Sequence, residues 1–202
     1  MHAATARPTL IEALWPAQDA RAQLTGTILR GAILAVVGSM LLTLSAKVNV
    51  PFYPVPMSMQ TFAVLVIGAA YGWRLGTATM LLYLAEGAAG LPVFAGTPEK
   101  GIGLAYMLGP TGGYLVGFVA GAAVTGWLCE RGWDRSWALL LAAMAIGHVL
   151  IFVFGVAWLA NLIGLEKAWA AGVVPFYLAT VLKTLLAAAV IKGGWSIASA
   201  RT

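Results

Sequence analysis

Residues 90–114 read GLPVFAGTPEKGIGLAYMLGPTGGY, and this stretch decides how the rest of the chain is arranged. It carries three prolines and seven glycines between two long hydrophobic runs. Proline cannot donate a helical hydrogen bond, and a bilayer offers none to irregular backbone. We therefore predict an irregular loop here, at the membrane surface, where the flanking hydrophobic segments end.

The composition of the flanking sequence is that of an integral membrane protein. Of the 202 residues, 61% are hydrophobic and only 9% are charged, and the mean hydropathy is +0.89. Soluble domains carry about a quarter charged residues. Because one membrane-spanning helix needs roughly 20 apolar residues, we expect an all-α protein with no separate soluble domain.

We predict six transmembrane helices in one bundle over residues 25–195, with polar tails at residues 1–24 and 196–202. Three prolines at positions 51, 54 and 56 favour an extended segment after the first span, and residues 71–74 form a tight turn. The expected spans are residues 25–46, 58–70, 75–89, 112–128, 136–163 and 173–191.

The positive charges predict the orientation in the membrane. Lys and Arg number 12 against 7 Asp and Glu, and they are dispersed singly, which is typical of topology signals and not of nucleic-acid binding. If the N-terminus lies in the cytoplasm, Lys47, Lys100 and Lys167 lie on the outer side of the membrane. The cytoplasmic side then holds Arg7, Arg21, Arg30, Arg74, Arg131, Arg135, Lys192 and Arg201. Both termini are thus expected in the cytoplasm, in a multi-pass protein of the inner (plasma) membrane.

Lys183 lies within the sixth predicted span, more than two helical turns before Lys192. A lysine at the middle of a span costs about 2.5–3.5 kcal/mol, so a compensating contact is expected. Phe176 and Thr180 share its helical face. We predict that Lys183 faces an anionic ligand in a protein-lined cavity; the alternative is that its side chain extends to the membrane interface.

Other polar and aromatic side chains fall near the outer ends of the spans. Gln60 is an amide in the first turn of the second helix, Tyr83 and Glu86 follow on the third, and Trp158 and Asn161 share a face of the fifth. They predict an outward-facing pocket for a small amphiphilic carboxylate. Trp158 could instead belong to an interfacial aromatic belt, and Asn161 could cap its helix.

Enzymatic and metal-dependent functions find little support. His148 has no partner histidine within the spans, so we expect it to be packed and hydrogen-bonded and predict no metal site. The sequence has neither a GxxxxGK phosphate loop nor a nucleophile with an adjacent base. We therefore predict neither ATPase activity, nor catalysis, nor a cofactor.

Small residues recur every fourth position on the first span, at Gly31, Ala35 and Ser39. Such a stripe allows another helix to approach closely. It serves either packing within the bundle or docking of a partner subunit.

Three motifs together resemble the BioY family, the biotin-specific S-components of energy-coupling factor (ECF) transporters. The motifs are PVPMSMQTF at residues 54–62, LYLAEGAAGLPVFAG at 82–96 and LGPTGGYLVGF at 108–118. The resemblance implies the six-helix S-component fold and biotin capture from outside. It also implies a transmembrane T-component and two ABC-type ATPase subunits as partners, although some members are thought to transport without them, as homo-oligomers.

The resemblance also implies roles for particular residues. Gln60 stands in the proline-rich motif, Phe94 and Gly96 in the GLPVFAG loop, and Tyr114 at the start of the fourth helix. The biotin ring would lie among the aromatic residues Phe94, Tyr114, Trp158 and Phe176.

Lys183 matches the sixth-helix lysine expected at the biotin carboxylate, whereas Thr180 stands where family members often carry an acidic residue. The ureido contact would then shift to Asn161, Glu86 or Gln60. The alternative function is an ion-coupled secondary transporter working alone, with Glu86 as its coupling carboxylate.

Overall fold

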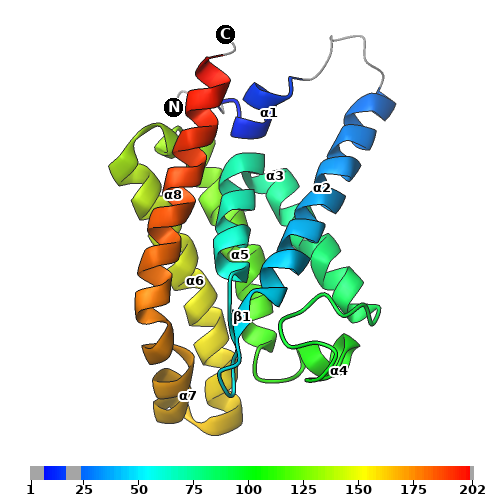
Figure 1. The fold of residues 1–202 in the computed structure, drawn as a ribbon, viewed down its shortest axis with the longest axis vertical. Coiled ribbons are helices and arrows are strands. Elements are labelled where there is room, and N and C mark those ends of the chain that lie inside the picture. The colour runs from blue at the N-terminus through cyan, green and yellow to red at the C-terminus, as the bar shows by residue number, and fades with distance from the viewer. Residues whose placement is uncertain (1–6, 17–23, 201–202) are drawn as a thin grey trace, which may run out of the picture.

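The computed structural model describes residues 7–16 and 24–200, which form a helical bundle with one short two-stranded hairpin (Figure 1). The elements are α1 (Leu10–Leu14), α2 (Leu24–Lys47), β1 (Asn49–Val50), β2 (Met57–Ser58), α3 (Gln60–Ala88), α4 (Gly103–Met107), α5 (Gly112–Cys129), η1 (Trp133–Arg135), α6 (Trp137–Ile163), α7 (Leu165–Gly172), η2 (Val174–Phe176) and α8 (Tyr177–Ser199).

Five helical segments of the described chain are long and apolar enough to cross a membrane. They are Gly26–Lys47, Gln60–Ala88, Gly112–Cys129, Trp137–Ile163 and Leu165–Ser199. The prediction of a mostly helical membrane protein is confirmed. The six expected spans correspond to five such segments because the second and third both fall within α3.

Helix α3 is interrupted at Gly72, inside the predicted turn. Gly72 has φ 79° and ψ 176°, which are not helical and which favour glycine. A Cβ added at Gly76 would lie 3.2 Å from the Cα of Gly68, although eight residues of straight helix extend about 12 Å. The two halves of α3 therefore fold back on each other as a helical hairpin.

Helix α5 packs against α3 on one side and α6 on the other, and small residues set both distances. A Cβ at Gly68 of α3 would lie 2.6 Å from the carbonyl oxygen of Ala122. A Cβ at Gly117 would lie 2.8 Å from the Cα of Ile151 on α6. Backbone-to-backbone packing of this kind is how membrane helices associate, and it makes α5 the central helix of the bundle.

Several boundaries differ from the prediction. The proline-rich segment forms an antiparallel hairpin that pairs Asn49 with Ser58, so α3 begins at Gln60 and not at residue 58. Residues 90–114 contain the short helix α4, and α7 occupies the expected connection before the last span. Helix α8 begins at Tyr177, later than expected, because Pro175 belongs to the 3-10 turn η2. It extends to Ser199, into the predicted tail.

The N-terminal segment contains a helix that the sequence analysis missed. The backbone N–H of Thr9 donates to Glu12 Oε2 (2.8 Å), and that of Glu12 donates to Thr9 Oγ1 (3.3 Å). This capping box starts α1, whose Leu10 is buried against Gly194 of α8. The signature T-x-x-E was available in the sequence. Arg21 and Arg201 of the predicted cytoplasmic set lie outside the described residues.

The small-residue stripe of α2 faces mostly inward. Ala35 and Ser39 are buried, with Ser39 only 1% exposed, and Gly31 is half-buried. Internal packing therefore accounts for Ala35 and Ser39, while docking of a partner through the stripe stays a prediction. The exposed side of α2 carries large apolar residues instead, namely Ile28, Leu29, Ile33, Val36, Val37, Met40, Leu41 and Leu44.

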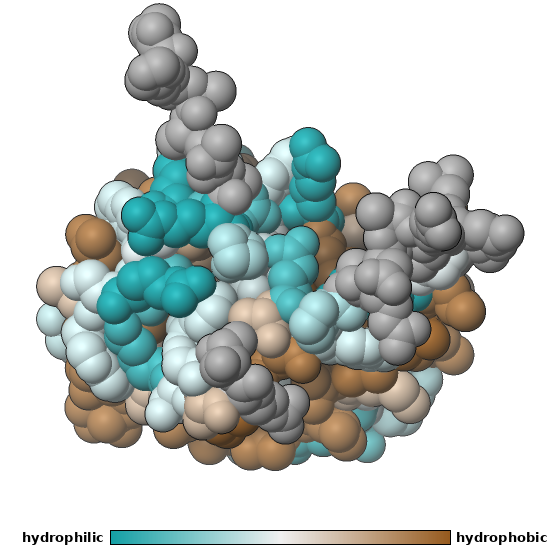
Figure 2. All heavy atoms as spheres, turned by 90° about the horizontal axis from the view of Figure 1, so that it is seen from above, coloured by the Kyte–Doolittle hydropathy of each residue, from teal (hydrophilic) through white to brown (hydrophobic). Residues whose placement is uncertain are grey.

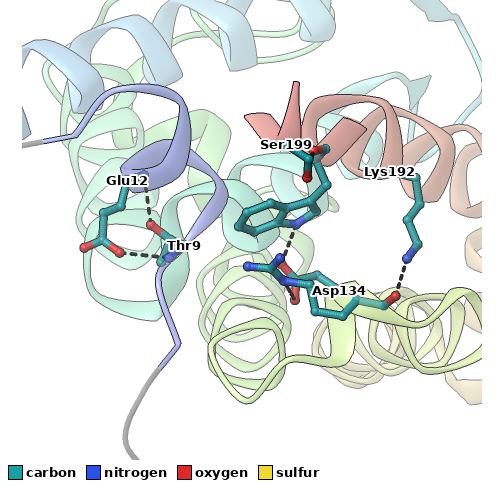
Figure 3. A network of polar contacts seen from close by, with 7 residues as sticks. Thr9, Glu12, Asp134, Lys192 and Ser199 are labelled. Carbon is teal, nitrogen blue, oxygen red and sulfur yellow. Dashed lines mark hydrogen bonds and ion pairs between the residues drawn. The ribbon is translucent and has the colours of Figure 1, made fainter. Parts of the chain in front are cut away.

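A polar network joins η1 to α8 at the end of the bundle where α8 finishes (Figure 3). The indole Nε1 of Trp195 donates to Asp134 Oδ2 (2.6 Å), and Lys192 Nζ donates to the carbonyl of Arg135 (2.5 Å). Asp134 is only 2% exposed, and this burial raises the pKa of its carboxyl group above the ordinary value. The buried carboxylate thus makes folding stability dependent on pH.

We expect Asp134→Asn to become more stable relative to the wild type as the pH rises. A raised carboxyl pKa contributes stability below the ordinary value of about 4, and this contribution is lost as the pH rises through the folded-state pKa. Asparagine cannot ionise, so the variant escapes that loss while still accepting the Trp195 hydrogen bond. Thermal unfolding in detergent from pH 4 to 8 measures the difference in midpoints. A difference that does not change with pH would contradict the assignment.

Candidate functional site

A cavity lies between the β1–β2 hairpin, the start of α3, the loop with α4, and helices α5, α6 and α8. Its wall is mostly apolar and aromatic, with several hydroxyls, one amide and one cation. The lining residues are Val55, Pro56, Ser58, Gln60, Thr61, Tyr106, Thr111, Tyr114, Leu115, Phe118, Ile151, Phe152, Phe176, Thr180 and Lys183. An apolar wall with a few convergent polar groups is typical of a small-molecule site.

Lys183 brings the only ammonium group to this wall. Its side chain is 8% exposed, and its Nζ donates to the carbonyl oxygen of Ser58 on β2 (2.6 Å). The side chain therefore turns into the bundle and not toward the interface. One carbonyl leaves the other donors of an ammonium group available to an anionic partner.

Aromatic rings form a fixed wall beside Lys183. The ring centroids of Tyr114 and Phe152 are 6.3 Å apart at 85°, and those of Phe152 and Phe176 are 6.3 Å apart at 65°. The hydroxyl of Tyr114 donates to the carbonyl of Gly172 (2.9 Å), which ties α5 to α7. Edge-to-face packing and this hydrogen bond hold the rings in place for a flat or apolar ligand.

A chain of hydrogen bonds fixes the amide of Gln60. Ser58 Oγ donates to Gln60 Oε1 (2.9 Å), Gln60 Nε2 donates to the hydroxyl of Tyr83 (2.7 Å), and that hydroxyl donates to the carbonyl of Val93 (2.8 Å). Gln60 lines the cavity, whereas Tyr83 is completely buried behind it. Tyr83 thus connects the pocket wall to the loop at residues 90–114.

We expect Tyr83→Phe to destabilise the protein by about 1–3 kcal/mol, because it leaves the Gln60 amide and the Val93 carbonyl without their partner. Thermal or chemical unfolding in detergent measures the loss. Tyr53→Phe is the matched control, since Tyr53 is 89% exposed. Equal stability of the two variants would show that the buried chain contributes nothing.

Phe94, which the sequence placed at the ligand, lies one layer behind the cavity. Its ring is fully buried, stacks on Tyr106 with centroids 5.0 Å apart, and meets Tyr83 edge-on at 5.3 Å. Lys47 Nζ donates to the carbonyls of Pro92 (2.6 Å) and Thr97 (3.0 Å), which holds the same loop. Phe94 therefore supports the cavity wall through Tyr106.

Of the other predicted residues, the structure brings some together and leaves some apart. Gln60, Tyr114, Phe176, Thr180 and Lys183 share the cavity wall. Gly96 is a turn residue of the loop, with φ 74°.

Three predicted residues of the outer ends do not reach the cavity. Glu86 accepts a hydrogen bond from Ser39 of α2. Trp158 Nε1 donates to the carbonyl of Gly109 (2.9 Å) and borders a separate apolar groove. Asn161 is exposed and donates to the carbonyl of Ala157 on its own helix (2.7 Å).

Several lining residues had not been predicted. Ser58, Thr61 and Thr111 supply hydroxyls, and Tyr106 and Phe152 supply rings. The first three lie within the quoted motifs at residues 54–62 and 108–118, so the motifs themselves were the available signal. Nothing in the local sequence marked Phe152.

His148 is buried at 2% exposure, and its Nδ1 lies 3.1 Å from Thr184 Oγ1. This agrees with the prediction of a packed, hydrogen-bonded histidine.

Comparison with known proteins gives consistent matches. The model of the BioY family matches residues 17–200. A biotin transporter BioY of Thermotoga maritima is 37% identical over 79% of this chain and 92% of its own length. A probable biotin transporter BioY of Pyrococcus horikoshii is 36% identical over 73% of this chain and 85% of its own.

The fold has also been seen before. The crystal structure of an S-component for biotin from an ECF-type ABC transporter superposes with a TM-score of 0.72, covering 84% of this chain and 93% of that one at 22% identity. This likeness shows the shared fold, and the family match covers nearly the whole sequence. The chain therefore belongs to the BioY family.

Proposed function

We propose that this protein captures biotin as the substrate-binding membrane subunit of an ECF-type ABC transporter. The observation that carries the proposal is an apolar and aromatic cavity with one buried ammonium group, that of Lys183. It is supported by relatives that are named biotin transporters. The protein is a transporter subunit and not an enzyme.

The cavity wall supplies the kinds of group that biotin needs, namely apolar and aromatic side chains, one cation, one amide and several hydroxyls. The carboxylate of biotin would accept hydrogen bonds from Lys183 Nζ, which among the described residues donates to the Ser58 carbonyl. A carboxylate gives a stronger, charge-assisted bond than a neutral carbonyl does. The fused ring would lie against Tyr106, Tyr114 and Phe176.

The ureido group needs both donors and acceptors. Gln60 is the best placed of the residues proposed for it, because its amide lines the cavity in an orientation fixed by Ser58 and Tyr83. Thr180 adds a hydroxyl on α8. Asn161 and Glu86, which bond elsewhere, are not assigned to this contact.

We further propose that the chain crosses the plasma membrane six times with both termini in the cytoplasm. Support comes from the break at Gly72, which divides α3 into two antiparallel halves. The segments that carry the predicted outer cations Lys47, Lys100 and Lys167 are the end of α2, the loop before α4, and α7, and they lie at the end opposite the described chain ends (Figure 1). The tails at residues 1–24 and 196–202 would be cytoplasmic, although α8 already includes residues up to Ser199.

The partners we propose are a transmembrane T-component and two ABC-type ATPase subunits. The chain has no phosphate loop of its own, so the energy of ATP hydrolysis has to come from other subunits. Helix α2 is proposed as the docking helix, through Gly31 and its exposed apolar face. The alternative is that α2 mediates contacts within homo-oligomers that transport without these partners.

A thermal-shift screen of the purified chain in detergent tests the ligand. Biotin should raise the unfolding temperature, because a ligand that binds only the folded state stabilises it. Riboflavin and thiamine are the controls and should give no shift. Absence of a response to biotin would overturn the proposed function while leaving the membrane fold intact.

Ion-coupled transport by the chain alone is the second candidate. It is favoured by Glu86, a half-buried carboxylate on a membrane helix that accepts a hydrogen bond from Ser39. Uptake of biotin into proteoliposomes under a proton or sodium gradient, without ATPase subunits, would support it. Uptake only with the ATPase subunits and ATP would exclude it.

A further inference from the structure

Every cation that stacks on an aromatic ring in the described residues lies at one end of the bundle. This is the end where α2 begins and where α5 and α8 finish (Figure 1). The guanidinium of Arg131 lies 3.3 Å from the ring centre of Trp127, and that of Arg135 lies 3.4 Å from the centre of Trp195. Three looser pairs at 5.3–5.7 Å join Arg74 to Trp73, Arg30 to Trp15 and Lys192 to Trp137. We call these five pairs the Trp–cation face.

The carboxylates near this face are occupied by N–H donors. Glu12 accepts from the backbone N–H of Thr9, Glu130 Oε1 accepts from that of Trp73 (3.0 Å), and Asp134 accepts from the Trp195 indole. Across residues 7–16 and 24–200, one ion pair lies within 4 Å, that of Arg135 Nε with Asp134 Oδ1 at 3.7 Å.

Arg74, Arg131 and Lys192 therefore have no close counter-ion in the described chain. Arg74 and Arg131 are exposed beside exposed indoles, those of Trp73 and Trp127. Stacking holds a guanidinium flat on the ring and leaves N–H groups at its edge free to bind oxygen.

The two ends of the molecule differ in charge. Near the Trp–cation face, six described cations stand against three carboxylates: Arg7, Arg30, Arg74, Arg131, Arg135 and Lys192 against Glu12, Glu130 and Asp134. The other end carries three described cations, Lys47, Lys100 and Lys167, and three carboxylates, Glu86, Glu99 and Glu166. Figure 2 shows hydrophilic residues gathered on the first of these ends and bordered by hydrophobic surface.

A cleft at this end offers a place for a single headgroup. It lies between α1, α2 and the turn of α3, and its lining includes Arg30, Arg74 and the acidic residues Glu12 and Glu130. The Nε of Arg30 is buried there with no hydrogen-bond partner among the described residues. A buried donor of this kind is normally satisfied by an acceptor.

We propose that the Trp–cation face binds the phosphate groups of anionic phospholipids in the leaflet that it meets. Indole rings settle at the headgroup level of a bilayer, which places the stacked cations beside lipid phosphates. Basic residues next to a membrane gain from an anionic surface. Lipid phosphates would supply the negative charge that balances the excess positive charge and the arginines without a counter-ion on this face.

The test measures how the thermal unfolding midpoint in dodecyl maltoside micelles depends on the mole fraction of the anionic lipid POPG, with the zwitterionic lipid POPC as reference. POPG should stabilise the wild type more than POPC does. The double variant R74Q/R131Q should need about twenty-five times more POPG for the same gain, because each cation contributes a factor of about five. The control K100Q/K167Q removes the same charge from the opposite end and should respond like the wild type.

Each outcome decides the matter. Equal responses of the two double variants would overturn the assignment of the site, because net charge alone would then explain the effect. A gain that sodium phosphate reproduces without lipid would assign the face to a free anion. No effect of POPG on the wild type would overturn lipid binding and leave an acidic protein partner as the complement of this face.

Discussion

Lys183→Ala is expected to weaken biotin binding by at least tenfold, which corresponds to about 1.4 kcal/mol or more. The side chain is buried, lines the cavity and donates a hydrogen bond to the carbonyl of Ser58. Alanine removes the only cation of the wall and thus the charge-assisted contact to the ligand carboxylate. Calorimetric titration of purified wild type and variant with biotin measures the effect.

Two further variants separate charge from folding in this experiment. Lys183→Met keeps much of the side-chain length without the charge and should lose affinity to a similar degree. Lys167→Ala removes an exposed lysine of α7 and should bind like the wild type. Equal affinities of wild type and both Lys183 variants would remove this residue from the site.

Gly87→Val is expected to disrupt the loop at residues 90–114 and, through it, the pocket. A Cβ at Gly87 would lie 2.0 Å from Cζ of Phe94, whose ring is fully buried between Tyr83 and Tyr106. The ring has no free space, so it must leave its place, and overpacking of this kind costs about 1–3 kcal/mol or more. Tyr106 lines the cavity, so we expect biotin affinity to fall together with the unfolding temperature.

The matched control is Ala85→Val, which adds a branched side chain to an exposed position of the same helix. It should change neither property appreciably. If Gly87→Val were as stable as Ala85→Val and bound biotin equally well, the packing of Phe94 would have no role in shaping the pocket.

Much of the architecture could be predicted because it depends on properties of single segments. Long apolar runs predict the membrane helices, and the sequence around Gly72 predicts the turn inside α3. The shorter elements were missed because their local signals, such as the T-x-x-E of residues 9–12, are short, and because contacts made in the fold stabilise them. The β1–β2 hairpin satisfies only a few backbone groups, and α1 depends on burial of Leu10 against α8.

Which candidate residues lie together on the cavity wall could be predicted where they share one helix. Phe176, Thr180 and Lys183 share one face of the last helical segment and do line one cavity. Trp158 and Asn161 also share a helical face, but periodicity does not say which neighbour that face meets. Helix α6 turns Gly155 toward Tyr114, where an added Cβ would lie 2.3 Å from the ring. Phe152 therefore reaches the cavity, and Asn161 stays outside it.

The same difficulty applied to Glu86 and Ser39. The sequence placed Glu86 near the ligand and Ser39 on a stripe that serves either packing within the bundle or docking of a partner subunit. In the structure they bond to each other between α2 and α3. A contact between residues 47 positions apart along the chain depends on how two helices are rotated, and neither local sequence carries that information.

The most direct measurement is a structure of the protein with biotin bound. We expect density for the ligand in the cavity between the β1–β2 hairpin, α5, α6 and α8, with the carboxylate within hydrogen-bonding distance of Lys183 Nζ and the ring against Tyr114 and Phe176. Biotin bound elsewhere, or bound in this cavity with its carboxylate away from Lys183, would contradict the proposed site.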